Sequence, residues 1–287
     1  MPEGPSIVIL REEVAGFAGQ KILRAEGNSR IDKDRLVGLR IKAFRSWGKH
    51  FLIELPSFSI RIHFLMFGSH TINERKDREP RLSLGFRKGE LNFYTCAVRI
   101  IEDELDHVYD WTGDVLADGW NPRAALKKLR ATPDTLVCDA LLDQDVFAGV
   151  GNIIKNEVLF RVRVHPLSTV GALPAAKLRA LVEQAREYSF DFLAWKRAFV
   201  LRKHWLVHNQ RTCPRCEVPL AKGYLGEKDR RSFYCERCQK KYGTAPPDVR
   251  ARKLMRVTKT TKPTKAAKTT KAAKATKAAK AAKATKA

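Results

Sequence analysis

Two closely spaced cysteine pairs constrain the fold of this chain more than any other feature. Cys213-Pro-Arg-Cys216 and Cys235-Glu-Arg-Cys238 are separated by 18 residues. Two C-x2-C pairs at this spacing predict a four-thiolate, tetrahedral Zn²⁺ site on a β-hairpin ribbon. Four thiolates leave no open coordination position, so the expected ion is single and structural. Four metal-free thiols or a redox C-x-x-C motif fit less well, because two pairs occur and no βαβ pattern surrounds them.

Charge is the second constraint. The 287 residues contain 55 Lys and Arg against 31 Asp and Glu, a formal net charge of +24. Such an excess indicates a polyanionic partner, either nucleic acid or an anionic membrane surface. No apolar run has the length of a membrane span, and the N-terminus lacks the pattern of a signal peptide. We therefore expect a cytoplasmic, nucleoid-associated protein without a membrane partner.

Hydrophobic patterning divides the chain into regions. After a short leading helix, runs rich in β-branched and aromatic residues alternate with turn residues, which predicts antiparallel strands of a sandwich or barrel. Farther along the chain the pattern becomes helical. The expected strands span 39–44, 51–55, 60–64, 82–86 and 98–101, and the expected helices span 6–18, 122–129, 135–142, 151–160 and 174–193.

These regions predict an α+β protein with two folded domains, each long enough to have its own core. An N-terminal antiparallel β-sandwich with a leading helix is expected over residues 1–120 and a helical domain over residues 121–210. The four-cysteine zinc ribbon follows at residues 211–243. Residues 244–287 are rich in Lys, Ala and Thr, with a lysine at every third position from Lys259, and predict a disordered basic tail. Such a tail suits contact with DNA phosphates, although a merely solubilising tail has the same composition.

A glycine-rich turn precedes one of the expected helices. Gly149 and Gly151 bracket this turn, and Asn152 follows it. Backbone N–H groups of such a turn suit a phosphate, and the Asn152 amide could cap the helix or bind the phosphate. An ordinary helix cap is the alternative interpretation.

Three motifs in this order resemble one protein family. Met1-Pro2-Glu3-Gly4-Pro5 opens the chain, Gly149-Val-Gly-Asn152 follows, and the cysteine pairs come last. Together they resemble the formamidopyrimidine-DNA glycosylase / endonuclease VIII family over about residues 1–242. The resemblance implies a helix-two-turn-helix element in the helical domain. It also implies a bifunctional DNA glycosylase and AP lyase of base excision repair, which we expect to act as a monomer on damaged double-stranded DNA.

The resemblance also implies an N-terminal nucleophile. Methionine before a small residue is normally removed, which would leave Pro2 with a free secondary amine. An α-amino group titrates at roughly pH 8, so a useful fraction is neutral and nucleophilic. Attack on the sugar C1′ would give a cationic iminium, which promotes cleavage of C–O bonds. The family implies this role for Pro2 and a general acid/base role for Glu3.

Three further residues match the family by position. Lys49, in a hairpin-like turn, resembles the lysine that contacts a phosphate by the lesion and assists elimination. Asn152 matches a phosphate-binding asparagine, and Arg230 matches the zinc-ribbon arginine that helps to drive δ-elimination. Arg231 is an alternative to Arg230, because a shift of one residue is compatible with the pattern.

An apolar run is expected to fill the gap left by a base that leaves the stack. Leu65, Met66 and Phe67 precede Gly68 at a predicted strand end, and they resemble the family's void-filling loop. Apolar side chains of this kind wedge into duplex DNA in other proteins that kink it. The alternative is that the three are core residues of a strand, although strand alternation would bury only some of them.

Other features bear on the branch of the family. Gly4 in place of leucine, and a segment over residues 195–212 without glycine, resemble the endonuclease VIII side and imply oxidised pyrimidines as substrates. An oxidised-purine glycosylase of the same family, acting on formamidopyrimidine or 8-oxoguanine, is one alternative. A catalytically weak DNA-damage-binding protein is another. Ser6 departs from the family's common glutamate, which bears on base preference more than on the cleavage of abasic sites.

Overall fold

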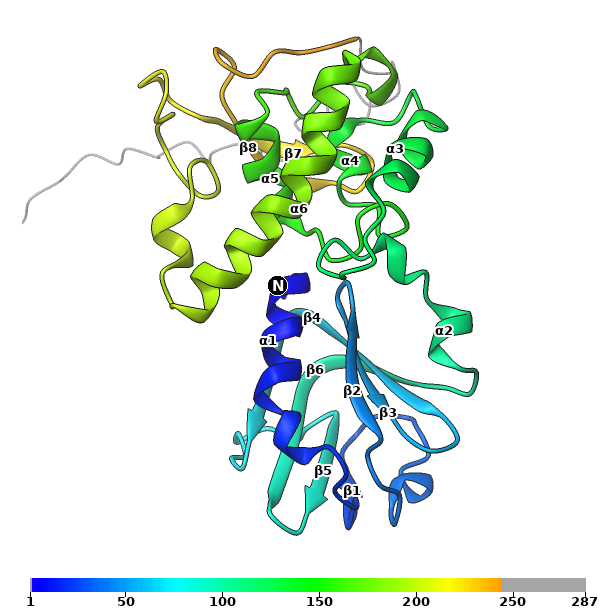
Figure 1. The fold of residues 1–287 in the computed structure, drawn as a ribbon. Helices are drawn as coiled ribbons and strands as arrows, with labels where there is room; N and C mark the ends of the chain where they lie inside the picture. Colours follow the sequence, from blue (N-terminus) through cyan, green and yellow to red (C-terminus); the bar gives the residue numbers. More distant parts are fainter. Residues whose placement is uncertain (1, 244–287) are drawn as a thin grey trace, which may run out of the picture.

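The computed structural model describes residues 2–243 as two domains that meet at the start of the first helix (Figure 1). The N-terminal domain carries a large sheet, and the C-terminal domain carries most of the helices and a small two-stranded ribbon. The predicted basic tail at residues 244–287 lies outside the described residues. Among residues 2–243, no helix combines the length and the hydropathy needed to cross a bilayer.

One antiparallel sheet forms the N-terminal domain, with the strand order β1-β5-β6-β4-β3-β2. The expected sandwich of two separate sheets is thus corrected to one hydrogen-bonded sheet. The reason is that β4 and β6 are long and stay paired on both sides of a register shift between Phe64 and Ser69, so they connect strands that would otherwise form two sheets. The strands are β1 (Arg24–Glu26), β2 (Ala43–Trp47), β3 (His50–Glu54), β4 (Ser59–Ile72), β5 (Leu82–Phe86) and β6 (Gly89–Ile101).

Helix α1 (Gly4–Glu13) packs on β2 and β3 and on the last long helix of the other domain. Pro5 suits its first turn, where a proline costs no helical hydrogen bond. Helix α1 and the sheet share one apolar core. Alternate residues of each strand point to the same face of the sheet, so one set of side chains faces this core. Its buried members come from α1 and from both ends of the sheet and include Ile7, Leu10, Phe51, Ile62, Leu84 and Phe93.

Helices pack around a second core in the C-terminal domain, which includes Phe147, Ile154, Val158, Leu181 and Tyr188. The expected helices are all present with shifted ends, and the shortest of them keeps only four residues. The helices are α2 (Leu105–Val108), α3 (Pro122–Arg130), α4 (Val137–Ala140), α5 (Asn152–Arg161) and α6 (Ala175–Arg197). The short 3-10 turns are η1 (Ala15–Phe17), η2 (Asp34–Leu36), η3 (Trp111–Gly113), η4 (Val170–Ala172) and η5 (Leu201–His204).

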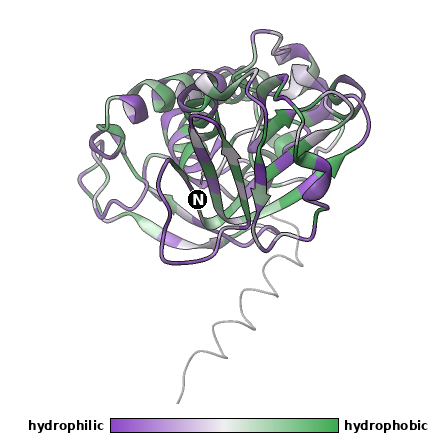
Figure 2. Cartoon of the chain, turned by 90° about the horizontal axis from the view of Figure 1, so that it is seen from below, coloured by the Kyte–Doolittle hydropathy of each residue, from purple (hydrophilic) through white to green (hydrophobic). Residues whose placement is uncertain are grey.

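The ribbon consists of β7 (Ala221–Leu225) and β8 (Arg230–Tyr234), and β8 packs against α5. Viewed from below, hydrophilic residues colour several loops around the strands, whereas hydrophobic residues recur within the strands themselves (Figure 2). This distribution agrees with the two cores, which leave the loops and the seam between the domains for polar chemistry.

Candidate active site at the seam between the domains

The Glu3 side chain crosses the seam and caps helix α5 of the other domain. Its carboxylate accepts hydrogen bonds from the backbone N–H groups of Gly151 at 3.2 Å, Ile153 at 2.7 Å and Ile154 at 3.2 Å. A carboxylate is favoured here because the first N–H groups of a helix lack helical acceptors and carry partial positive charge. Pro2, partly buried, is thereby held beside the start of α5.

This geometry corrects two expectations about the glycine-rich turn. Asn152 does not cap α5, since Glu3 satisfies its first N–H groups. Nor are the turn's N–H groups open to a phosphate: Gly151 donates to Glu3, and Gly149 donates to Gln144 Oε1 at 3.2 Å. The glycines instead permit close packing, because a Cβ on Gly151 would collide with the Glu3 carboxylate.

Lys49 lies in the two-residue turn between β2 and β3, as the sequence predicted. The preceding Gly48 has a positive φ of 52° and donates its N–H to Asp114 Oδ2 at 2.8 Å. A Cβ on Gly48 would lie 2.8 Å from the Gly149 nitrogen. The turn is therefore fixed to the second domain through backbone atoms.

Opposite charges at this seam perturb one another. Burial raises the pKa of the Glu3 carboxyl, while the nearby Lys49 ammonium and the helix N–H groups oppose that rise. Burial also lowers the pKa of Lys49, aided by the positive charges of Arg230 and Lys228 and opposed by Glu3. A carboxyl and an amine whose pKa values are shifted toward each other in this way suit proton transfer.

A pocket of about 200 Å³ lies between the domains and is lined by Lys49, Leu142, Asn152, Lys228 and Arg230. Three residues predicted from the sequence thus meet in one place although they come from a turn, a helix and the ribbon. Lys228 was not predicted as a site residue, and its Nζ donates to the Leu142 carbonyl at 3.1 Å. The pocket combines three cations with one amide, which suits a phosphate.

Three side chains of helix α5 donate to one carbonyl group of the ribbon. The Arg231 carbonyl oxygen accepts from Asn152 Nδ2 at 2.9 Å, from Lys155 Nζ at 3.4 Å and from Asn156 Nδ2 at 3.4 Å. The Arg231 side chain lies over the Phe233 ring, and Arg230 is the neighbour that lines the pocket. Of the two arginines that the sequence left as alternatives, Arg230 is therefore the one that lines the pocket.

Sequence reasoning missed Lys155, which is 1% exposed and donates to Ser232 Oγ at 2.8 Å. Burial lowers its pKa to about 8. It also missed Asp139, whose carboxylate accepts the N–H groups of Glu227 and Lys228 at 2.9 and 3.1 Å. Charged residues normally indicate an exposed face, so no sequence signal identified this pair as buried supports of the ribbon.

Leu65, Met66 and Phe67 are exposed in succession, at 48%, 55% and 77%. Strand alternation would bury at least one of them, but the register of β4 shifts between Phe64 and Ser69. Opposite this excursion, Thr95 has a positive φ of 50°, which is uncommon for a β-branched residue. The core alternative is therefore wrong for these three side chains, which project from the sheet outside the pocket.

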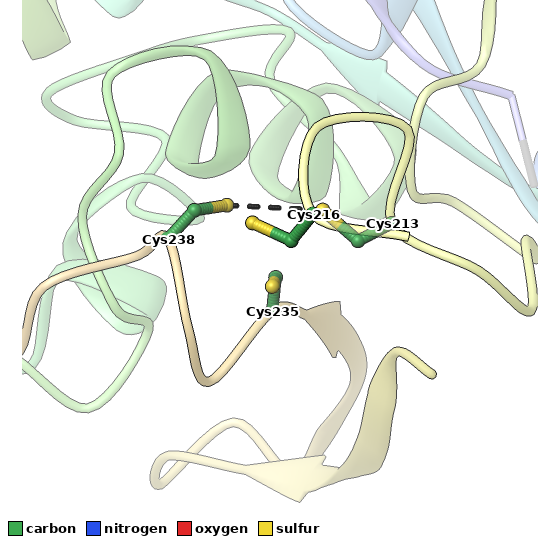
Figure 3. Close-up of side chains that lie close together, drawn as sticks. All are labelled: Cys213, Cys216, Cys235 and Cys238. Carbon is green, nitrogen blue, oxygen red and sulfur yellow. Dashed lines mark hydrogen bonds between the residues drawn. The ribbon is translucent and has the colours of Figure 1, made fainter. Parts of the chain in front are cut away.

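The four predicted metal ligands form a separate cluster at the ribbon (Figure 3). Their sulfur atoms all lie within 4.8 Å of one another, and Cys213 and Cys238 are 3.8 Å apart. Tetrahedral Zn–S bonds of about 2.3 Å place neighbouring sulfurs about 3.8 Å apart, so the donor set and spacing fit zinc. Arg215, between the first pair, donates to the Phe160 carbonyl at 2.7 Å and ties the cluster to the end of α5.

Comparisons with known proteins agree with this architecture. The N-terminal domain model of formamidopyrimidine-DNA glycosylase matches residues 1–99, and the H2TH domain model of the same enzyme matches residues 113–188. The crystal structure of Lactococcus lactis formamidopyrimidine-DNA glycosylase bound to DNA containing an AP site superposes with a TM-score of 0.75, at 21% identity, over 83% of this chain and 100% of that one. At this identity, the likeness establishes the fold.

Proteins found by comparison of sequences share a higher sequence identity with this chain than that solved structure does. Endonuclease 8 2 of Mycobacterium bovis is 30% identical over 267 residues, which cover 84% of this chain and 100% of the relative. Endonuclease 8-like 3 of Xenopus laevis is 31% identical over 235 residues, 76% of this chain. That alignment spans only 38% of the Xenopus protein, so this chain matches less than two fifths of its length.

Proposed function

Because the chain belongs to the formamidopyrimidine-DNA glycosylase and endonuclease VIII family, we propose that it is a bifunctional DNA glycosylase and AP lyase of base excision repair. One observation carries the proposal: Lys49, Asn152 and Arg230 line one basic pocket at the seam where Pro2 and Glu3 meet helix α5. These residues come from four segments of two domains. Their convergence does not stabilise the packing of the domains, because cations placed close together repel one another.

Pro2 supplies the nucleophile once Met1 has been removed. Its nitrogen forms a bond to C1′ and gives up its proton, while the bond from C1′ to the base breaks and the base leaves as a protonated, neutral molecule. The C1′–O4′ bond of the sugar then breaks, O4′ takes up a proton, and a cationic C=N iminium forms between C1′ and Pro2. The resulting iminium accepts electrons when a C2′ proton is lost, which breaks the C3′–O bond. A second elimination breaks the C5′–O bond and leaves a one-nucleotide gap. Hydrolysis of the imine frees Pro2.

The surrounding residues act on protons and phosphates. Glu3, with its raised pKa, transfers a proton to and from the deoxyribose. Lys49 and Asn152 hold the phosphate at the lesion, and Arg230 holds the phosphate that leaves in the second elimination. Fixed cations at the positions where charge develops favour each elimination.

Zinc is proposed as the one resident ion and has a structural role. Cys213, Cys216, Cys235 and Cys238 would hold it and so fix the ribbon that carries Arg230. When bound, four thiolates leave the ion no position for water or substrate, and it stabilises the fold.

The substrate is damaged double-stranded DNA. Leu65, Met66 and Phe67 enter the stack and fill the gap left by the flipped base. An oxidised pyrimidine is the proposed base, since Gly4 and the segment over residues 195–212 resemble the endonuclease VIII side. Competing excision of thymine glycol and 8-oxoguanine from otherwise identical duplexes tests this preference, and faster release of 8-oxoguanine would contradict it.

Borohydride trapping on an abasic-site duplex tests the mechanism. We expect the wild type to form a covalent adduct and Pro2→Thr to form far less, since a freely rotating primary amine replaces the ring-held secondary amine. Initiator methionine is also removed before threonine, so the variant has a free N-terminus as well. Pro174→Ala is the matched control. It removes the proline that directly precedes α6, so this variant should be trapped normally. Mass spectrometry must show that Met1 is absent. No adduct with processed, zinc-loaded wild type would refute the lyase and favour a damage-binding protein.

A further inference from the structure

Two cations reach one hydroxyl group immediately after the exposed apolar run of β4. Lys76 Nζ donates to Ser69 Oγ at 2.7 Å, and Arg78 Nη2 donates to the same oxygen at 3.3 Å. Lys76 and Arg78 both belong to the exposed connection between β4 and β5. The two positive groups therefore lie close together at the surface.

Tyr94 forms the floor under both cations. Its ring centroid lies 5.3 Å from Lys76 Nζ and 5.3 Å from the Arg78 guanidinium carbon. Its hydroxyl accepts the Lys76 N–H at 3.1 Å, and its register partner in the sheet is Ser69. Tyr94 is fully buried, so the platform is rigid and orients both charges.

Neutralising carboxylates are not paired with these two cations. The ion pairs found within residues 2–243 include neither Lys76 nor Arg78. Arg75, in the same connection, is instead paired with Glu26 at 3.2 Å and Glu90 at 2.8 Å. The connection thus neutralises one cation and leaves the next two available to an anion.

We propose that Ser69, Lys76 and Arg78 form a phosphate-binding site that grips the DNA backbone beside the base pair opened by Leu65, Met66 and Phe67. The inference rests on the proposed function, because it assumes that the apolar run enters the duplex. Ser69 is two residues beyond Phe67, so the site lies within about 7 Å of the wedge along the strand. A phosphate bound there would hold the DNA backbone in its kinked form. Phosphate contacts of this kind fix the register and orientation of a protein on the duplex.

A salt titration of binding to a duplex with a stable abasic-site analogue tests the site. Lys76→Met/Arg78→Met should lower the steepness of log K against log salt by about 1, since the loss of one phosphate contact removes about 0.9. Arg87→Met/Lys88→Met is the matched control, because it removes the same two charges from the exposed turn between β5 and β6. Its steepness should stay closer to that of the wild type. Equal changes in both double variants would overturn the site and indicate a nonspecific charge effect.

Failure of this site and failure of the enzyme are distinguishable. At low salt and saturating abasic-site DNA, Lys76→Met/Arg78→Met should still be trapped by borohydride, because Pro2 is intact. Loss of trapping in the wild type would instead refute the proposed function. If the double variant does not fold, the single variants Lys76→Met and Arg78→Met should each lower the steepness by part of the same amount, and no change in either overturns the proposal.

Discussion

The β2–β3 turn and the β7–β8 ribbon bring cations into the same pocket but are fixed in different ways. The turn that carries Lys49 is held through backbone atoms, with the Gly48 N–H on Asp114 and Gly48 close against Gly149. The ribbon that carries Arg230 is held by side chains. Its supports are the α5 donors on the Arg231 carbonyl, the Asp139 carboxylate and the cysteine cluster.

This difference predicts different vulnerabilities. The backbone contacts of Gly48 leave no room for an added atom, although the acceptor of its N–H group is the buried Asp114 carboxylate. Side-chain supports tolerate substitution better, yet they depend on buried charge and on a bound ion, which respond to pH and to chelators. The first half of the site should therefore fail by steric change and the second by a change of conditions.

The largest effect is expected from Gly151→Ala at the seam between the domains. The new Cβ would displace the Glu3 carboxylate from the three N–H groups at the start of α5. Because misplacement by about 1 Å costs about a hundredfold in rate, single-turnover cleavage of abasic-site DNA should slow by about that factor or more. Gly119→Ala is the control, since its added Cβ meets nothing within 4 Å. Similar rates for the two variants would show that the contact of Glu3 with the start of α5 does not position its carboxylate for catalysis.

Removal of zinc should have the next largest effect and should act on the ribbon alone. Without the ion, Lys228 and Arg230 lose their fixed positions, so DNA affinity should fall roughly tenfold and the salt dependence should flatten. Borohydride trapping at saturating DNA should persist, because Pro2 and Glu3 lie on the other side. Cys235→Ser should reproduce the loss and Cys96→Ser, outside the cluster, should not. Loss of trapping in parallel with affinity would mean that both halves depend on the metal.

The same division separates what the sequence predicted from what it did not. The cysteine ribbon, the Lys49 turn and the long helices were predictable because spacing and periodicity are local properties. The cap on α5 was not, since Glu3 lies 148 residues from Gly151 in the chain and only packing of the two domains joins them. Strand β1 was missed because three residues carry too little alternation to be recognised.

Buried charges were the other omission. Lys155 and Asp139 look like exposed residues in the sequence. The docking of β8 on α5 covers Lys155, and the turn between β7 and β8 covers Asp139 of α4. For the apolar run at residues 65–67, the sequence was compatible with exposed side chains that wedge into DNA and with buried side chains of a strand. The choice depended on a register shift that sequence alternation does not record.

Asp114→Ala should have a smaller effect and tests the backbone anchor of the turn. It leaves the Gly48 N–H without its acceptor at 2.8 Å, and an unsatisfied buried donor costs about 1 to 3 kcal/mol. We expect about tenfold slower single-turnover cleavage with nearly unchanged affinity for DNA, since Lys49 loses position but not charge. Asp114→Asn retains one oxygen and should lose less. Equal loss in both, or a loss confined to affinity, would contradict a positioning role.

The smallest effect on catalysis is expected from Lys155→Met, less than about fivefold, because one buried hydrogen bond is worth about 1 kcal/mol. Its effect on the pH dependence of stability should be clear. Burial lowers the pKa of Lys155 to about 8, against 10.5 for an ordinary lysine. Between these values the unfolded chain holds a proton that the folded protein has released, so the free energy of unfolding rises with pH.

Below about pH 8 the amine is charged in both states and the cost of burying it, about 3 kcal/mol, is present in full. Above the ordinary pKa that cost is absent. Urea unfolding of the wild type and Lys155→Met on both sides of pH 8 should therefore show a rise with pH that is larger in the wild type, since Lys49, whose pKa burial also lowers, contributes equally to both. Lys177→Met, which removes a partly exposed lysine of α6, should keep the wild-type rise. Parallel curves for the wild type and Lys155→Met would mean that the ribbon is anchored without a buried charge, and the contrast between the two halves of the site would then rest on zinc alone.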